Sequence, residues 1–230
     1  MFKNIALSQE EISIILGGLL GDSCFKKNQN TINFRHSIKQ KEYIYWKYNK
    51  LKNISGKITE SIDCNGFEYI TFNILTNKDK NMEHFYNIIK ALIYRRKEKG
   101  ITRKYLNLLT PLSLAIWWMD DGCLSIHKGN RYGKLCTHCF TYEENLIIQK
   151  YLQTVWDIRV DIKLEKNKYY FCRINVNNLK KIIKIIYLYV LEVPDMVYKI
   201  DLNYKNNVNL GDFEDVYNKI KYSKVKMLIS

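Results

Sequence analysis

The stretch LAIWWMDDGC, residues 114–123, joins an apolar helical run to two adjacent carboxylates and a glycine. The run carries two tryptophans and suits a buried helix, yet it leads directly into Asp120 and Asp121. A buried carboxylate without a partner is costly, so a cation or strong hydrogen-bond donors must receive it. We therefore expect this helix to end at the floor of a cleft, with its acids over a bound metal ion.

A second stretch, ILGGLLGDS at residues 15–23, also ends in a carboxylate. Its glycines should each cost a helix roughly 1 kcal/mol relative to alanine, and close approach of another backbone is the usual reason to tolerate them. We therefore expect the two helices to pack together, with their C-terminal ends side by side. Asp22 and Asp121 would then meet at the negative ends of two helix dipoles, a site that favours a hard cation such as Mg²⁺.

The elements around these stretches follow the same order twice. Capping boxes at Ser8–Glu11 and Thr141–Glu144 predict helix starts, and alternating hairpins are predicted at residues 57–74 and 159–175. Each half is predicted to have the element order αββαββα. In the second half, the first pair of strands is expected to end with GKLCTHCF, residues 133–140. An internal repeat of this kind decides the fold class.

The spacing of acids and lysines supports the repeat. Asp22 and Lys99 are 77 residues apart (99 − 22), and Asp121 and Lys199 are 78 apart (199 − 121). The sequence thus predicts an α+β fold with two pseudo-symmetric repeats joined through the two motif helices, each repeat an antiparallel sheet with helices packed behind it. The predicted boundaries are 8–107 for the first repeat, 108–208 for the second and 209–230 for a basic C-terminal tail.

The charge balance points to a polyanionic partner. The 230 residues carry 37 Lys and Arg against 23 Asp and Glu, a net charge of +14, which favours nucleic acid over a membrane surface. No apolar run approaches the roughly 20 residues of a membrane span, and the N-terminus lacks the features of a secretory signal. We expect an intracellular protein whose six cysteines are thiols.

Strand alternation separates a core face from a polar face in both hairpins. The side chains expected to face the core are Ile58, Ile62, Ile70 and Phe72 in the first hairpin and Val160, Ile162, Leu164 and Ile174 in the second.

The two stretches resemble the paired signature helices of the LAGLIDADG homing endonucleases in their two-motif, monomeric form, and look especially like the intron-encoded enzymes of yeast mitochondria. In the first motif, Gly17 stands at the family's glycine and Asp22 at its metal-binding acid, whereas Gly18 and Leu20 depart from the consensus. The second motif, LTPLSLAIWWMDDG at residues 109–122, places Asp121 at the acid.

The resemblance extends over nearly the whole chain, from residue 8 to about 202, and VPDMVYK at residues 193–199 is similar to the family's C-terminal segment with its lysine. It implies saddle-shaped sheets that bind the major groove of double-stranded DNA at a long, tolerant site. The implied activity is a Mg²⁺-dependent double-strand break, with Mn²⁺ able to substitute, that promotes mobility of the host intron. The expected protein is a monomer that needs no protein partner and is encoded in a mitochondrion.

The resemblance also assigns the site. Asp22, Asp121, Lys99 and Lys199 are the expected catalytic residues, with Lys97 as the alternative to Lys99. The expected metal site holds Asp22 and Asp121, together with the residues directly before them, Gly21 and Asp120, although the repeat match makes Asp121 rather than Asp120 the partner of Asp22.

Residues expected to contact DNA are polar side chains on and beside the predicted strands. They are Lys26, Lys27, Asn33, Arg35, Lys57, Thr59, Ser61, Tyr69, Thr71, Asn73, Arg131, Lys134, Arg159, Asp161, Lys163, Arg173 and Asn175.

Other interpretations stay open. Some family members bind RNA, so an RNA maturase that assists splicing of its own group I intron is the alternative function, with intron RNA as partner; a DNA-binding regulator without activity is the third. Retention of Asp22 and Asp121 favours cleavage.

Other residues of possible functional interest have a simpler interpretation. His36 and His138 are expected to be core histidines, and Cys136 with Cys139 cannot complete a zinc site alone. No phosphate-binding loop of the G-x-x-x-x-G-K-[ST] type is present.

Overall fold

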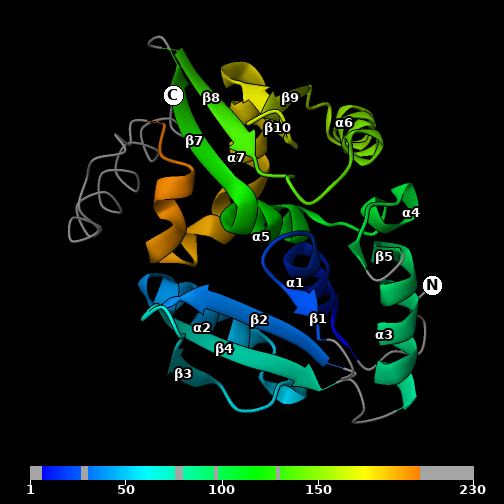
Figure 1. Cartoon of the computed structure of the whole chain (residues 1–230), viewed down its shortest axis with the longest axis vertical. Helices are drawn as coiled ribbons and strands as arrows, with labels where there is room; N and C mark the ends of the chain where they lie inside the picture. Colours follow the sequence, from blue (N-terminus) through cyan, green and yellow to red (C-terminus); the bar gives the residue numbers. More distant parts are fainter. Residues whose placement is uncertain (1–6, 27–30, 76–79, 96–97, 128–129, 203–230) are drawn as a thin grey trace.

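The computed structural model describes residues 7–26, 31–75, 80–95, 98–127 and 130–202, which form two repeats (Figure 1). The first repeat comprises α1 (Gln9–Leu20), β1 (Cys24–Phe25), β2 (Thr31–Ser37), α2 (Lys41–Lys50), β3 (Thr59–Ile62), β4 (Glu68–Leu75) and α3 (Lys80–Ile93). The second comprises α5 (Pro111–Asp121), β7 (Gly122–His127), β8 (Asn130–Leu135), α6 (Tyr142–Trp156), β9 (Asp161–Glu165), β10 (Tyr169–Asn175) and α7 (Val176–Leu191). The short elements β5 (Tyr94–Arg95), β6 (Glu98–Lys99) and α4 (Arg103–Leu106) connect them, and a 3-10 helix (Pro194–Lys199) follows α7.

The two sheets have the same topology. Their strand orders are β1-β2-β4-β3 and β7-β8-β10-β9, and every pairing within them is antiparallel. The predicted α+β class and the αββαββα order are therefore confirmed. The domain boundaries stay a prediction, and the tail at 209–230 lies outside the described residues.

Local signals in the sequence explain where the helices begin. The Ser8 hydroxyl accepts a hydrogen bond from the Glu11 N–H at 3.1 Å, and the Glu11 carboxylate accepts one from the Ser8 N–H at 2.7 Å. Thr141 and Glu144 form the same reciprocal pair at the start of α6. Both predicted capping boxes are present, and each satisfies two backbone donors that a helix start leaves free.

The motif helices α1 and α5 lie side by side between the two sheets (Figure 1). A Cβ atom added to Gly17 would stand 2.5 Å from the carbonyl oxygen of Ser113, so only glycine lets the backbones approach this closely. Gly21 is likewise pressed against the side chain of Asp120. The expectation that the glycines mark a close helix contact is confirmed at these positions.

Three expectations about strands were wrong. Ile62 and Leu164 were expected in the core, but they are 66% and 50% exposed. Both lie on the edge strands β3 and β9, each of which has a neighbouring strand on one side only. The strand expected to run to Phe140 ends at Leu135, and a turn follows.

None of the helices in the described ranges combines the length and the apolar character needed to cross a membrane.

Candidate active site

Two carboxylates stand at the ends of adjacent helices. The Gly21 N–H donates to the Gly17 carbonyl at 3.2 Å as α1 ends, and Asp22 follows directly. Asp121 is the last residue of α5. Gly17 packs on Ser113 and Gly21 on the residue before Asp121, so the two helices run in the same direction and bring both acids to one end.

The buried Asp120 is fully engaged by hydrogen-bond donors. Its side chain is 0% exposed. Its Oδ1 atom accepts from the Tyr43 hydroxyl and from the Lys47 ammonium, both at 2.7 Å, and its Oδ2 atom accepts from the Asp22 N–H at 3.2 Å. Burial alone would raise the pKa of Asp120, but Lys47 and Tyr43 outweigh that effect and lower the pKa below its usual value. Asp120 is therefore an ionised carboxylate.

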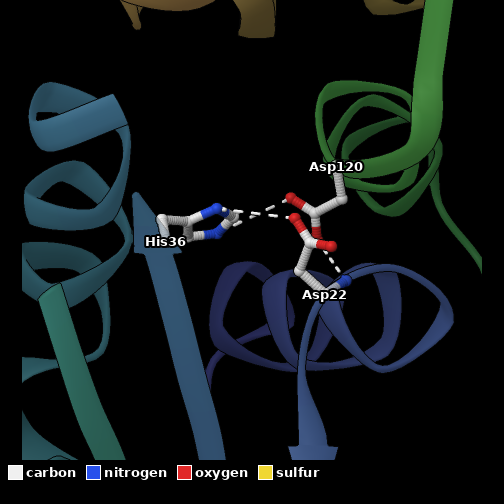
Figure 2. A group of neighbouring side chains, drawn as sticks. All are labelled: Asp22, His36 and Asp120. Atoms are coloured by element: carbon white, nitrogen blue, oxygen red, sulfur yellow. Dashed lines mark hydrogen bonds and ion pairs between the residues drawn. The ribbon is translucent and has the colours of Figure 1, made fainter. Parts of the chain in front are cut away.

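His36 on β2 points at the same acids (Figure 2). Its Nε2 atom is 3.0 Å from the Lys47 ammonium, and its Nδ1 atom is 3.1 Å from Gln40 Oε1 and 3.5 Å from Asp22 Oδ2. Burial and the charge of Lys47 lower the pKa of His36 to about 3, so the ring is neutral and Nε2 accepts from Lys47. His36 is buried as expected, but its neighbours are polar.

Ligand atoms of Asp22, His36 and Asp120 lie within 4.8 Å of one another, as metal ligands do. However, His36 and Asp120 already accept hydrogen bonds from the Lys47 ammonium. A metal ion among these three residues would face the ammonium group of Lys47 at close range. A metal role for Asp120 therefore stays a prediction, and in this arrangement its carboxylate oxygens accept hydrogen bonds from protein donors.

Asp22 and Asp121 remain as the acids that fit a cation. Burial raises the pKa of Asp121 to about 8, with further contributions from the charges of Asp120 and Asp22. Burial and Asp120 raise the pKa of Asp22 to about 6, although 43% of the Asp22 side chain stays accessible to solvent. Burial is the main cause of both raised pKa values, and the nearby negative charge of Asp120 adds to it. A divalent cation would offset the negative charge of these oxygen donors, and the identity of the metal stays a prediction.

A lysine donates to the backbone carbonyl of a residue next to each acid. The Lys99 ammonium, on β6, donates to the carbonyls of Gly21 at 2.7 Å and Ser23 at 3.1 Å. The Lys199 ammonium donates to the Gly122 carbonyl at 2.7 Å, and burial lowers the pKa of Lys199. The two lysines thus occupy matching places in the two repeats. A metal role for the Gly21 carbonyl stays a prediction, and Lys97 lies outside the described residues.

Mg²⁺ should stabilise the protein more strongly as the pH rises from about 5.5 to about 8.5. The raised pKa values mean that the folded protein binds protons at Asp22 and Asp121 more tightly than the unfolded chain does. Without metal, their contribution to stability is present at acidic pH and is lost as the pH rises through about 6 and about 8. Mg²⁺ competes with these protons, and Asp121 should dominate because solvent screens Asp22.

Thermal unfolding with and without Mg²⁺ across this range measures the effect as a shift in Tm. In the Asp121→Asn variant, Mg²⁺ should raise the Tm only slightly at every pH. The Asp157→Asn variant, which changes an acid whose side chain is 80% exposed, should behave like the wild type. A metal-dependent shift of the same size at every pH would contradict proton displacement from these acids.

Seven of the residues expected to contact DNA share one face of the first sheet, which we call the first polar face. Its members are Asn33, Arg35, Thr59, Ser61, Tyr69, Thr71 and Asn73, as the strand register shows. The Asn33 amide donates to Thr71 at 2.8 Å and to Asn73 at 2.9 Å, and the Arg35 guanidinium lies 3.5 Å from the centre of the Tyr69 ring. These contacts hold polar groups in fixed positions on an open surface.

The second polar face, on the second sheet, consists of Lys134, Arg173, Asp161 and Lys163, and register places the first three opposite one another on adjacent strands. The Lys134 ammonium is 2.8 Å from both carboxylate oxygens of Glu165. This ion pair neutralises part of the expected positive charge.

Two further expected DNA contacts, Arg131 and Asn175, have different surroundings, and their roles stay predictions. Arg131 pairs with Ile126 and lies on the opposite face of β8 from Lys134, so it leaves the second polar face. The Asn175 side chain caps α7 by accepting from the Asn178 N–H at 3.0 Å, which engages its oxygen.

The remaining expected DNA contacts lie beside the strands. Lys57 and Arg159 are exposed and precede β3 and β9, Lys26 is half-buried after β1, and Lys27 lies outside the described residues.

Sequence reasoning missed Lys47 and Tyr43 as parts of the site. Both lie on α2, and Lys47 is fully buried. A signal was available, because residues 43, 44, 47 and 51 follow the spacing of one helix face, and the other three are apolar. A lysine on an otherwise apolar face indicates a buried acid as its partner.

The fold and the paired acids define a two-repeat protein with an acidic centre at one end of its two motif helices. The family model described as "LAGLIDADG DNA endonuclease family" matches residues 12–182. The chain belongs to the LAGLIDADG DNA endonuclease family.

A solved structure with the same fold is the homing endonuclease I-WcaI bound to its DNA recognition sequence. It aligns with a TM-score of 0.71 and 23% sequence identity, over 88% of this chain and 90% of that one. The comparison confirms the fold.

Curated relatives include a maturase and an endonuclease. The cytochrome b mRNA maturase bI2 of Saccharomyces cerevisiae is 28% identical over 225 residues, which are 87% of this chain and 49% of the maturase. The DNA endonuclease I-ChuI of Chlamydomonas applanata is 28% identical over 169 residues, 67% of this chain and 76% of that protein. The protein RecA of Mycobacterium shimoidei is 27% identical over 68% of this chain, but the match spans only 38% of that RecA. The chain thus spans less than half the length of the maturase and RecA relatives.

Proposed function

We propose that this protein is a site-specific homing endonuclease that makes a Mg²⁺-dependent double-strand break in a long DNA target. One observation carries the proposal: two acids stand at the ends of adjacent helices that lie between the two sheets, and a lysine donates to a backbone carbonyl next to each acid (Figure 1). A pair of acid and lysine in each repeat suits a reaction carried out once on each strand.

The polar faces account for binding. A sheet of antiparallel strands fits the major groove, where side chains can reach base edges and phosphates. The net charge of +14 favours association with duplex DNA and makes it dependent on salt. Because both repeats belong to one chain, a monomer has two complete faces, and no protein partner is needed.

The acidic centre accounts for cleavage. Bound at Asp22 and Asp121, divalent metal would stabilise the charge that develops on the attacking and leaving oxygens of a phosphodiester. The two carboxylates hold the ion and fix its place relative to the DNA. Lys99 and Lys199 keep the backbone next to each acid in position and set positive charge beside the cleft, where it can orient the attacking water.

RNA maturase activity is the second candidate. The observation in its favour is the 28% identity to the maturase bI2 over 87% of the chain. A maturase would use the polar faces to bind intron RNA and would not need the acids. The same relative supports an organelle-encoded protein. Mobility of the host intron remains part of the endonuclease proposal.

The purified protein should cut duplex DNA in Mg²⁺ and be inert in EDTA. Cleavage sites can be recovered by sequencing the cut ends from a randomised duplex library, and from DNA in which the exons that flank the coding intron are joined. Ca²⁺ should support binding without cleavage, because it occupies sites made of oxygen ligands but supports the chemistry poorly. Cleavage of the selected duplex in EDTA would contradict the mechanism, whereas RNA splicing assistance without any DNA cleavage would favour the maturase.

A further inference from the structure

The lysine at position 47 is unusual because it is fully buried in the interior of a basic protein. A lysine is almost never fully buried unless an acid pairs with it. Its ammonium donates to Asp120 at 2.7 Å and to His36 at 3.0 Å, and it lies 4.1 Å from the centre of the Tyr43 ring. Lys47 therefore has acceptors and an aromatic face around its charge.

These contacts form a path from α2 to the backbone of Asp22. Lys47 and Tyr43 hold the Oδ1 atom of Asp120, which belongs to α5 in the other repeat. The Oδ2 atom of the same carboxylate accepts the Asp22 N–H at 3.2 Å (Figure 2). The orientation of Asp120 thus depends on Lys47, and the backbone of Asp22 depends on Asp120.

The side chain of Asp22 is held from a second direction. His36 Nδ1 lies 3.5 Å from Asp22 Oδ2, and the His36 ring packs on Tyr43 with their centres 4.9 Å apart. Because Lys47 also donates to His36 Nε2, the same ammonium fixes both groups that contact Asp22.

The second repeat is built differently around its own acid. On α6, which corresponds to α2, the buried polar residue is the neutral Asn145, whose partners are the Thr137 hydroxyl and the carbonyls of Phe140 and Thr141. Within the described ranges, no ion pair involves Asp121.

We propose that Lys47 is a positioning residue for Asp22, acting through Asp120 and His36; this rests on the proposed function, in which Asp22 holds the metal ion. The buried cation aligns one acid of the pair with the incoming metal. It does not touch the DNA or the metal itself. Partners that orient metal ligands in this way commonly contribute about 10- to 100-fold to metal affinity or activity.

A merely structural ion pair would behave differently from a positioning one. Removing one partner of a buried pair leaves an uncompensated charge and destabilises the fold, whereas removing both partners is often close to neutral. The Lys47→Met/Asp120→Asn double variant should therefore regain much of the Tm lost in the Lys47→Met variant. Under the positioning proposal the double variant should not regain the cleavage rate, because nothing then orients Asp22.

The experiment measures single-turnover cleavage of the selected duplex, DNA affinity in Ca²⁺, and Ca²⁺ affinity of the free protein by calorimetry. Lys47→Met should lower the rate and the Ca²⁺ affinity at least about tenfold each, with DNA affinity changed less than about threefold. Tyr43→Phe should lower the rate about threefold to tenfold, because it removes one hydrogen bond to a charged group. Tyr105→Phe is the matched control, since the Tyr105 hydroxyl is also buried and also donates at 2.7 Å, but to the Leu16 carbonyl.

The outcomes are separable. A wild-type protein that cuts no DNA contradicts the proposed function alone, and the Ca²⁺ calorimetry then still tests the positioning role. If Lys47→Met does not fold, the comparison of Tyr43→Phe with Tyr105→Phe decides, and equal effects of these two variants overturn the proposal. Recovery of both the Tm and the cleavage rate in the double variant also overturns it, because the pair would then be structural.

Discussion

Replacing either Asp22 or Asp121 with asparagine should lower double-strand cleavage by at least about 10³-fold, with DNA affinity in Ca²⁺ changed by less than about tenfold. The two carboxylates stand at the ends of α1 and α5, where burial and the neighbouring charge of Asp120 raise the pKa of each. An amide cannot supply the negative charge that holds a divalent cation. Because the two acids lie at one end of the helix pair, loss of either one should impair the cutting of both strands.

A duplex labelled differently on its two strands measures the effect strand by strand. The Asp157→Asn variant is the control for the substitution, because Asp157 is exposed and pairs with Lys181 away from the motif helices. Circular dichroism checks that each variant is folded. Wild-type rates on both strands in either the Asp22 or the Asp121 variant would refute the assignment.

Replacing Lys99 or Lys199 with methionine should lower the single-turnover rate by at least about 10²-fold, with affinity reduced by less than about tenfold. Each ammonium donates to a backbone carbonyl next to one of the acids, at 2.7 Å in both repeats. A group that acts mainly in the transition state changes the rate at saturation more than it changes binding. A phosphate contact instead changes affinity and its salt dependence.

The controls separate these two roles. Lys57→Ala, at an exposed lysine before β3, should weaken binding with little effect on the saturated rate. Lys181→Met should change neither, although the Lys181 ammonium also donates to a backbone carbonyl, that of Asp157, at 2.8 Å. If Lys199→Met weakens binding and leaves the saturated rate unchanged, then this lysine acts only as a clamp on the DNA.

The repeat, the sheet order and the contact between the motif helices could be predicted because each leaves a periodic signal. Capping boxes begin helices through local hydrogen bonds, and Gly17 of α1 lets the backbone of α5 approach closely. The acid–lysine pairs could be predicted for the same reason, because Asp22 and Lys99 have nearly the same separation along the chain as Asp121 and Lys199.

The environment of Asp120 could not be predicted in the same way. The repeat match pairs Asp22 with Asp121 and treats Asp120 as an extra acid, yet Asp120 is the most engaged carboxylate of the three. Its partners come from α2, in the other repeat, and a pattern along the chain does not say which buried side chains meet across a helix interface. The exposure of Ile62 and Leu164 has a similar origin, because alternation gives the face of a strand but not its place in the sheet, and both residues lie on edge strands.

Gly21 and Asp120 occupy matching places in the two repeats, each directly before one of the paired acids, and they contact each other where the helices end. A dimer of two first repeats would place Gly21 of one copy against Gly21 of the other and leave Lys47 without a carboxylate partner. A dimer of two second repeats would place Asp120 of one copy against Asp120 of the other, without Lys47 to pair with either carboxylate. We therefore expect the two halves, if separated, to pair with each other in preference to copies of themselves.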